Sequence, residues 1–267
     1  SFTIAAENAD DYPDLPDVGE GRGIKIPQNA LKSLIGGTIF AVSENQARPI
    51  HTGVRFEVED NAISAIAVDG FRLARRTYHP EESTGRVLAF VVPAQALKEV
   101  EKILTDSEDN AIFTLGAKHI LFQIGGATLV CRLLDGDFLD WKKVVPTNCP
   151  VKLVANVGDL SSSIERVGLI VSEKFKSPVR CTFSNQVLQL RTTTTIGNAE
   201  DQCTIAGDGK DLEIGFNVRY LADALRAVPS EEVTLELTNG LSPIVLTPVD
   251  DKVDFAYMVL PVRLKSN

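Results

Sequence analysis

The sequence predicts an α+β protein made of two similar units of about 120 residues, each with two helices packed on one face of antiparallel sheet. Helical and strand patterns occur in the same order in both halves of the chain. The strands follow one another through short turns, which is typical of antiparallel pairing. Matching positions also keep a nearly constant offset, since Ile63 and Leu188 are 125 positions apart and Leu97 and Leu221 are 124 apart. A duplicated domain explains all three observations.

The first helix of the first unit starts at Pro27, a residue that is well tolerated at the start of a helix. Apolar residues at helical spacing and then apolar-polar alternation define its elements, with Gly116 and the pair 125–126 supplying turns. In chain order we expect a helix over 27–43, a hairpin of strands 54–58 and 63–68, a helix over 93–104, and strands 111–115, 119–124 and 128–133. The helix positions expected to face the core are Leu31, Leu34, Ile35, Ile39 and Val42, then Leu97, Val100, Ile103 and Leu104.

The second unit repeats this order from Val151, and Asn217 has the side chain of a helix N-cap. In chain order we expect a strand over 151–155, a helix over 157–171, a hairpin of 180–183 and 187–193, a helix over 217–228, and strands 233–237, 244–247 and 255–262. Each unit should hold about eight strands in all. The corresponding domain boundaries are 1–22 for an incoming strand and linker, 23–147 for the first unit and 148–267 for the second.

Composition and charge exclude several classes of protein. The chain has 267 residues, 44% of them hydrophobic and 24% charged, as in an ordinary globular protein, and its apolar runs are too short for a membrane helix. The net charge of −9 argues against a nucleic-acid binder that is basic over its whole surface. The four cysteines form no CxxC pair and have no histidine at ligand spacing, so we expect free thiols in a reducing cytosol, no metal and no cofactor.

The four expected helices differ in charge from the rest of the chain. They carry a net charge of +1, whereas all other residues together carry −10. A local excess of cations inside an acidic protein is what a surface facing phosphate needs, although mixed charges are also common on solvated helices. The cations on these helices are Lys32, Lys98, Lys102, Arg166, Arg219 and Arg226.

Three segments carry a resemblance to a known family: Ala67–Ala74 (AVDGFRLA), Leu134–Trp141 (LDGDFLDW) and Tyr257–Leu264 (YMVLPVRL). With Ser172–Phe175 (SEKF) and Gly215–Asn217 (GFN), they resemble the bacterial beta sliding clamp family, the beta subunit of DNA polymerase III. The match extends over the whole chain and corresponds to the second and third of that family's three domains. The resemblance thus implies that residues 1–18 are the last strand of a first domain and a linker, which the acidic, proline-containing stretch 10–17 also suggests.

The resemblance implies a non-catalytic processivity factor: a head-to-tail homodimeric ring in the cytoplasm, threaded by duplex DNA that it contacts without reading sequence. Helices would line the hole and present the six cations named above. Leu169 and Ile170 would lie at the ring interface. A chain without the first domain is expected to be mainly monomeric.

The resemblance further implies a hydrophobic groove that binds short linear peptides of polymerases, the clamp loader and repair proteins. An apolar floor with a few polar groups suits such peptides. Carried over position by position, the groove would use His51, Val68, Gly70, Phe71, Arg72, Leu73, Leu139, Lys143, Val144, Phe175, Asn217, Tyr220, Leu241, Pro243, Met258, Val259, Leu260, Pro261, Val262, Arg263 and Leu264. Leu73→Asp, or deletion of 259–264, should then abolish peptide binding and leave the fold intact.

Two groove positions depart from the family pattern. Leu139 follows Phe138 where the family often has proline, and His51 stands where an aliphatic residue is usual. His51 could serve as a pH-dependent rim contact or as a structural histidine. Both departures bear on the shape of the pocket and on its peptide preference.

Two other functions are open at the level of sequence. One is a hydrolase that uses Cys131 with His119 on a neighbouring strand, although nothing nearby in the sequence activates that thiol. The other is a repeat scaffold that does not bind DNA. Alkylation of Cys131 and binding of a Gln-Leu-rich peptide distinguish the hydrolase from the clamp.

Overall fold

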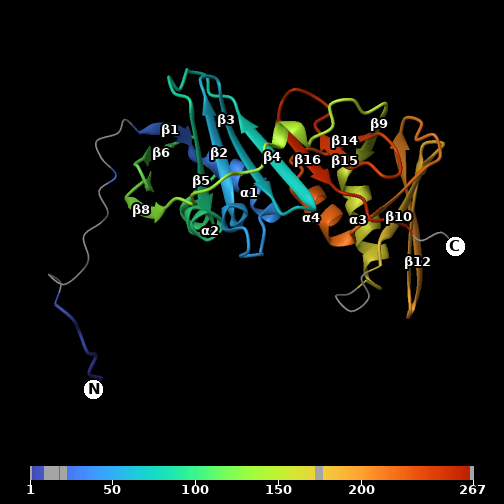
Figure 1. The fold of residues 1–267 in the computed structure, drawn as a ribbon, viewed down its shortest axis with the longest axis horizontal. Helices are drawn as coiled ribbons and strands as arrows, with labels where there is room; N and C mark the ends of the chain where they lie inside the picture. Colours follow the sequence, from blue (N-terminus) through green and yellow to red (C-terminus); the bar gives the residue numbers. More distant parts are fainter. Residues whose placement is uncertain (1, 9–17, 19–22, 172–176, 265–267) are drawn as a thin grey trace.

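The computed structural model describes residues 2–8, 18, 23–171 and 177–264, and shows two α+β units side by side (Figure 1). Residues 2–8 form no strand, and Phe2 and Ile4 are exposed. The stretch 10–17 expected as a linker lies outside the described residues. Within the described part of the chain each unit has eight strands and two α-helices, in agreement with the prediction.

The first unit runs from β1 to β8. Its elements are β1 (Ile24–Pro27), α1 (Gln28–Gly36), β2 (Gly53–Glu59), β3 (Ala62–Val68), β4 (Arg72–Tyr78), β5 (Leu88–Pro93), α2 (Ala94–Ile103), β6 (Asn110–Leu115), β7 (His119–Ile124) and β8 (Ala127–Arg132), with short 3-10 turns η2 (Ile39–Ala41) and η3 (Pro49–Thr52). A connecting segment with the turn η4 (Trp141–Lys143) leads to the second unit.

The second unit repeats the order of the first. Its elements are β9 (Val151–Asn156), α3 (Val157–Gly168), β10 (Val179–Ser184), β11 (Val187–Thr194), β12 (Gly197–Ala206), β13 (Leu212–Phe216), α4 (Val218–Arg226), β14 (Glu232–Leu237), β15 (Ile244–Thr247) and β16 (Asp254–Val259). The hairpin β10–β11 is turned by Asn185 and Gln186, both with positive φ, as a tight two-residue turn requires.

One large antiparallel sheet runs through both units. Its twelve strands are ordered β13-β10-β11-β12-β9-β14-β15-β16-β4-β3-β2-β5, and a separate four-stranded sheet has the order β1-β6-β7-β8. The pair β16–β4 joins the units, with Asp254 opposite Thr77 at one end and Val259 opposite Arg72 at the other. The two units therefore share a hydrogen-bonded sheet in addition to their side-chain contacts.

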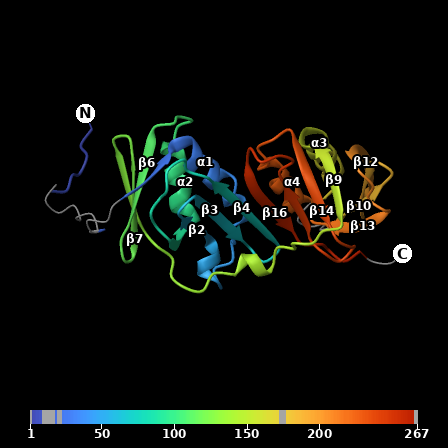
Figure 2. The same cartoon turned by 90° about the horizontal axis from the view of Figure 1, so that it is seen from above.

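The helices cover one face of the large sheet, which we call the helix face. In the first unit α1 and α2 also contact the small sheet, so they lie between two sheets (Figure 2). In the second unit α3 and α4 contact each other, α3 lies on β9, β11 and β12, and α4 lies on β16. A single apolar core on this face extends through both units, and Tyr257 at the junction is completely buried, edge-on to Phe40 with ring centroids 5.5 Å apart.

Several sequence expectations differ from the structure, among them the ends of the helices expected over 157–171 and 217–228, which stop at Gly168 and Arg226. The helix expected over 27–43 ends at Gly36, because the Gly36-Gly37 pair interrupts it and Thr38 Oγ1 donates back to the Leu34 carbonyl at 2.7 Å. Ile103 was expected to face the core but is 38% exposed, because α2 ends there and Leu104 takes the inward position. The strand expected over 255–262 ends at Val259.

Several strands were not located by the sequence patterns. These are β1, β4, β5, β12 and β13. β4 carries arginines at positions 72, 75 and 76, and β12 is polar along most of its length, so neither shows the apolar alternation that identifies a half-buried strand.

Candidate functional site at the junction of the two units

A second apolar cluster lies on the other side of the large sheet, which we call the outer face. Successive side chains of a strand point to opposite faces. Ala65 and Ala67 of β3 therefore join the main core, whereas Ile66 and Val68 join the second cluster. The buried members of this junction cluster are Ile66, Val68, Leu73, Val245, Ala256 and Met258, contributed by strands of both units.

Side chains from the connecting segment and the C-terminal tail cover the junction cluster. Phe138, Trp141, Val145 and Leu260 pack against it. Trp141 is held by its Nε1–H, which donates to Glu57 Oε2 at 3.3 Å, and by the Arg75 guanidinium 5.2 Å above its ring. Sequence reasoning did not assign Phe138 and Trp141 to the site, although both lie in the LDGDFLDW segment; their role depends on where that segment crosses the sheet.

The turn between β3 and β4 presents Phe71. Asp69 Oδ1 accepts the backbone N–H groups of Phe71 and Arg72 at 2.8 and 3.0 Å, and Gly70 has φ +92°, a conformation that glycine adopts most readily. Phe71 is 58% exposed and stacks on Tyr220 of the second unit, with ring centroids 5.9 Å apart.

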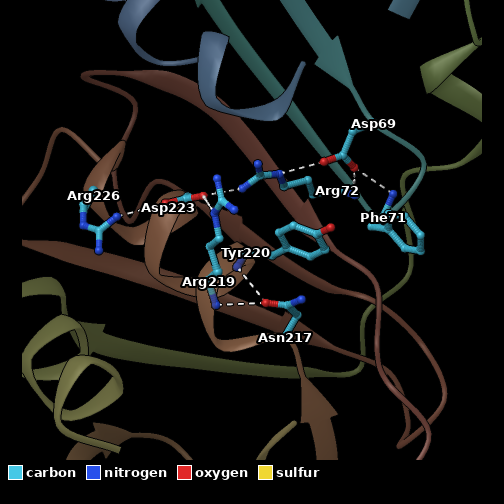
Figure 3. A network of polar contacts seen from close by, with 8 residues as sticks. All are labelled: Asp69, Phe71, Arg72, Asn217, Arg219, Tyr220, Asp223 and Arg226. Atoms are coloured by element: carbon cyan, nitrogen blue, oxygen red, sulfur yellow. Dashed lines mark hydrogen bonds and ion pairs between the residues drawn. The ribbon is translucent and has the colours of Figure 1, made fainter. Parts of the chain in front are cut away.

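Arg72 has a different environment from Phe71 because it begins β4 and points to the helix face. Its guanidinium is buried and pairs with Asp69 of its own unit at 2.9 Å and with Asp223 of the other unit at 2.6 Å (Figure 3). It also lies 4.5 Å from the centre of the Tyr220 ring and 5.5 Å from that of Phe40. We call Arg72 with its two carboxylate partners the Arg72 clasp.

Helix α4 brings the residues of the second unit to the clasp. Asn217 caps the helix as the sequence predicts, because its Oδ1 accepts the N–H groups of Arg219 and Tyr220 at 2.9 and 3.4 Å. Tyr220 lies on the first turn and Asp223 on the next, so both reach toward Arg72 (Figure 3).

His51 lies in the turn η3 beside the connecting segment. Its ring is edge-on to Phe138, with centroids 5.3 Å apart, and its buried Nε2 has no hydrogen-bond partner within the described residues. Burial, and to a lesser degree the charge of Arg48, lowers the pKa of His51 below its ordinary value of 6.5.

The C-terminal tail leaves β16 at Val259 and continues across the junction. The Leu260 N–H donates to the Phe71 carbonyl at 2.9 Å, and the Val262 N–H donates to the Gly215 carbonyl at 2.8 Å. A side chain at Gly215 would collide with the tail, because a Cβ there would lie 2.6 Å from Leu264 Cδ2. The tail is thus fixed to both units.

The predicted groove residues fall into two neighbouring groups. Val68, Leu73, Met258 and Leu260 belong to the junction cluster, whereas Phe71, Arg72, Asn217 and Tyr220 surround the clasp. Leu73 is only 1% exposed, so the expectation that Leu73→Asp preserves the fold is wrong: the charge would be buried against Met258. Deleting 259–264 would likewise remove Val259, which is fully buried.

Other predicted groove residues lie at the edges of this region. Leu139, Lys143 and Val144 are exposed on the connecting segment, and Lys143 pairs with Asp140 at 2.9 Å. Leu241 and Pro243 belong to the loop between β14 and β15. Phe175 lies outside the described residues.

An open cavity of about 1300 Å³ lies away from the junction cluster, on β10 to β13. Its lining includes Arg180, Gln189, Arg191 and Glu200, together with the tail residues Val262, Arg263 and Leu264. Because polar side chains dominate it, this cavity does not match the apolar groove that the sequence predicts.

The six helix cations are mostly paired with acidic residues. Lys102 pairs with Glu99 at 2.8 Å, Lys32 with Asp106 at 2.9 Å, and Arg166 with Asp201. Arg226 pairs with Asp223 at 2.9 Å and lies 3.6 Å from Glu165, whereas Arg219 is 4.0 Å from Asp223. Lys98 is exposed and has no ion pair within the described part of the chain.

The structure argues against a Cys131–His119 catalytic pair. Cys131 is directly opposite Ile120, and His119 is opposite Arg132, so the thiol and the imidazole are on opposite faces of the small sheet. Burial raises the pKa of Cys131 to about 11, which leaves the thiol protonated at neutral pH. Within the described residues there is also no group of three or more His, Cys, Asp or Glu side chains that could hold a metal ion.

The repeated units, with helices along one face of a shared sheet and an apolar cluster on the other, define a protein of tandem clamp domains. Two family models match: the central domain of the DNA polymerase III beta subunit over residues 25–140, and its C-terminal domain over 142–263. The chain therefore belongs to the bacterial beta sliding clamp family, as the sequence resemblance predicts, and the family is that of a non-catalytic processivity subunit.

Relatives and solved structures agree with this assignment. Beta sliding clamps of Staphylococcus epidermidis and Staphylococcus aureus are 31% identical, with matches covering 98% of this chain and 70% of theirs. A putative DNA polymerase III beta subunit from Eubacterium rectale superposes with a TM-score of 0.92 at 31% identity, covering 98% of this chain and 70% of that one. The sliding clamp of Bacillus subtilis gives 0.89 at 29% identity, covering 97% and 69%.

Among the described residues, no helix is both long and apolar enough to span a membrane.

Proposed function

We propose that this chain forms part of a sliding clamp that encircles duplex DNA and tethers the replicative polymerase, the clamp loader and repair proteins through short peptides bound at the junction of its two units. Such a protein contributes processivity topologically and carries out no chemistry. The proposal includes a homodimeric ring for the full-length protein and a cytoplasmic location, both in keeping with the family.

The distribution of exposed apolar side chains carries the peptide-binding part. Twelve large hydrophobic residues are exposed in the described chain, and five of them are groove positions carried over from the family: Phe71, Leu139, Val144, Leu241 and Val262. We call these five the junction surface. Each of the five lies within four positions of a residue that belongs to the junction cluster or packs against it. Exposed apolar residues of this kind are typical of protein-binding surfaces, and Leu and Phe anchors of a peptide would bury them further.

The cationic helix residues support the DNA-binding part. Their partial neutralisation by acidic neighbours favours weak phosphate contacts, which allow a clamp to slide, over tight ones that would hold it in place. Leu169, 84% exposed after the end of α3, and Ile170 are proposed to pack against another subunit at the ring interface.

Peptide binding can be tested with a fluorescein-labelled Gln-Leu-rich peptide that ends in Leu-Phe. We expect saturable binding by anisotropy, and Leu139→Asp and Val144→Asp should each weaken it at least about tenfold, because a charge must then be buried without a partner. Leu139 and Val144 are 36% and 37% exposed, so urea unfolding of each variant serves as the check that the fold is kept. Val87→Asp is the matched control, since Val87 is equally apolar and 81% exposed but lies before β5.

Equal affinity in the two junction variants and in Val87→Asp would refute the peptide site.

The DNA-independent scaffold makes a different prediction, namely normal peptide binding with no retention of duplex DNA at low salt.

A further inference from the structure

One carboxylate connects the proposed DNA side of α4 with the junction. Asp223 accepts Arg72 Nη1 on Oδ2 at 2.6 Å and Arg226 Nη1 on Oδ1 at 2.9 Å, and Arg219 Nε lies 4.0 Å from Oδ2 (Figure 3). The three arginines differ in exposure, because the Arg72 side chain is 8% exposed, whereas those of Arg219 and Arg226 are 66% and 60% exposed. A single negative charge is therefore divided between one buried cation and two solvated ones.

Arg72 belongs to the backbone that carries Phe71, one of the five residues of the junction surface. Its neighbour Phe71 accepts the Leu260 N–H through its carbonyl and presents its ring to Tyr220. Its other neighbour, Leu73, lies opposite Met258 in the strand pair that joins the units. A shift of the Arg72 guanidinium would thus move both the turn that carries Phe71 and the tail hydrogen-bonded to it.

We propose that Asp223 is a positioning residue that couples occupancy of the α4 arginines to the geometry of the junction. When an anion such as a DNA phosphate binds Arg219 and Arg226, these two arginines attract Asp223 less strongly. The Asp223 carboxylate then pairs with Arg72 alone. The Arg72 clasp tightens and the junction surface binds peptide more strongly. This inference rests on the proposed function for the identity of both ligands, and linkage requires the peptide to strengthen the phosphate contacts equally.

Charge-removing variants test the coupling without any DNA. Arg219→Gln with Arg226→Gln imitates the withdrawal of both exposed cations. We expect amide hydrogen exchange in the segment 255–264 to slow, and affinity for the labelled Gln-Leu-rich peptide to rise about two- to fivefold, the range of a surface charge interaction. Asp223→Asn should have the opposite effect on both measurements.

Combining the changes provides the decisive readout. In the triple variant Asp223→Asn, Arg219→Gln, Arg226→Gln, the gain from removing the arginines should disappear, because the carboxylate that transmits it is absent. Asp223→Glu should restore part of the peptide affinity that Asp223→Asn loses. A structural role alone would not produce effects of opposite sign within one cluster. The matched control is Lys32→Gln with Lys102→Gln, which removes two helix cations that pair with Asp106 and Glu99 in the first unit.

Unchanged or faster exchange in the Arg219→Gln, Arg226→Gln variant would overturn the proposal, as would a gain that persists in the triple variant or an equal gain in the control. Failure of the proposed function is distinguishable, because it would appear as no peptide binding by the unmodified chain, whereas the exchange measurement still reports on the clasp.

Discussion

Leu73 of β4 stands directly opposite Met258 of β16, in the strand pair that joins the two units. Their side chains meet on the outer face and form the centre of the junction cluster, with exposed fractions of 1% and 6%. The site proposed for peptides therefore rests on a contact that neither unit can make by itself. The same residues therefore determine both the stability of the junction and the shape of the proposed site.

The Leu73–Met258 contact predicts energetic coupling between the units. Leu73→Ala should cost about 2 to 5 kcal/mol of unfolding free energy, because it leaves a cavity in a fully buried cluster. Combined with Met258→Ala, it should deviate from additivity by about 0.5 kcal/mol or more in urea unfolding. Leu73→Ala with Leu190→Ala, in the core near α3, should instead be additive. Additivity in both pairs would show that the junction cluster does not act as one packed unit.

His51 predicts a pH dependence of stability. Since its folded-state pKa lies below 6.5, the unfolded chain binds the proton more readily. The stability that neutral His51 contributes is therefore complete above pH 6.5 and is lost as the pH falls through the lowered folded-state pKa. Between pH 7.5 and 5.5, Tm of the wild-type chain should fall more than Tm of His51→Leu, in which the other two histidines are unchanged. Equal decreases in Tm for the two proteins would show that neutral His51 does not contribute this stability.

Lys98 and Lys102 predict unequal contributions to DNA binding, although both lie on α2. Lys102 is already paired with Glu99, whereas Lys98 is exposed without an ion pair in the described residues. Lys98→Gln should therefore weaken binding of a short labelled duplex more than Lys102→Gln does, and reduce the slope of log affinity against log salt by up to about 0.9. The opposite ranking in a salt titration would remove Lys98 from the proposed DNA surface.

Cys131 predicts slow chemical modification. With a thiol pKa of about 11 instead of 9.0, its thiolate fraction at pH 7.5 is about a hundredfold lower than that of an ordinary cysteine. Iodoacetamide should therefore label the folded chain slowly at this position, as shown by mass spectrometry against Cys131→Ser, and labelling should leave peptide affinity unchanged. Rapid labelling of the folded chain would contradict this prediction and indicate an activated thiol. As a control, unfolding in urea should expose all four cysteines to the reagent.

The sequence predicted most of the local structure. The offset of about 125 residues located the duplication. Asn217 was identified as an N-cap, and the pair 125–126 was expected to be a turn, which it forms between β7 and β8. These features are local, because a cap, a turn or an amphipathic face depends on residues a few positions apart. The helix predicted over 27–43 was too long. The apolar spacing continues past Gly36 and Gly37, but the helical backbone ends at Gly36.

The composition of the site could not be obtained in this way. Arg72 was expected to be a groove residue. In the structure its guanidinium is buried between the carboxylates of Asp69 and Asp223, and the contact with Asp223 could not be predicted because the two residues are far apart in the sequence. Trp141 and Phe138 were quoted only as parts of a motif, yet they cover the junction cluster.

The sequence by itself determined that the chain contains two copies of one α+β unit, which family it resembles, and which residues cap and turn its elements. Only the tertiary structure decided that β4 and β16 pair into one sheet, that Leu73 and Met258 are buried together, and that Asp223 is shared by three arginines. Periodicity records which side of an element is apolar, but the pairing of two distant strands depends on packing and hydrogen bonding along the whole junction, which no short segment encodes.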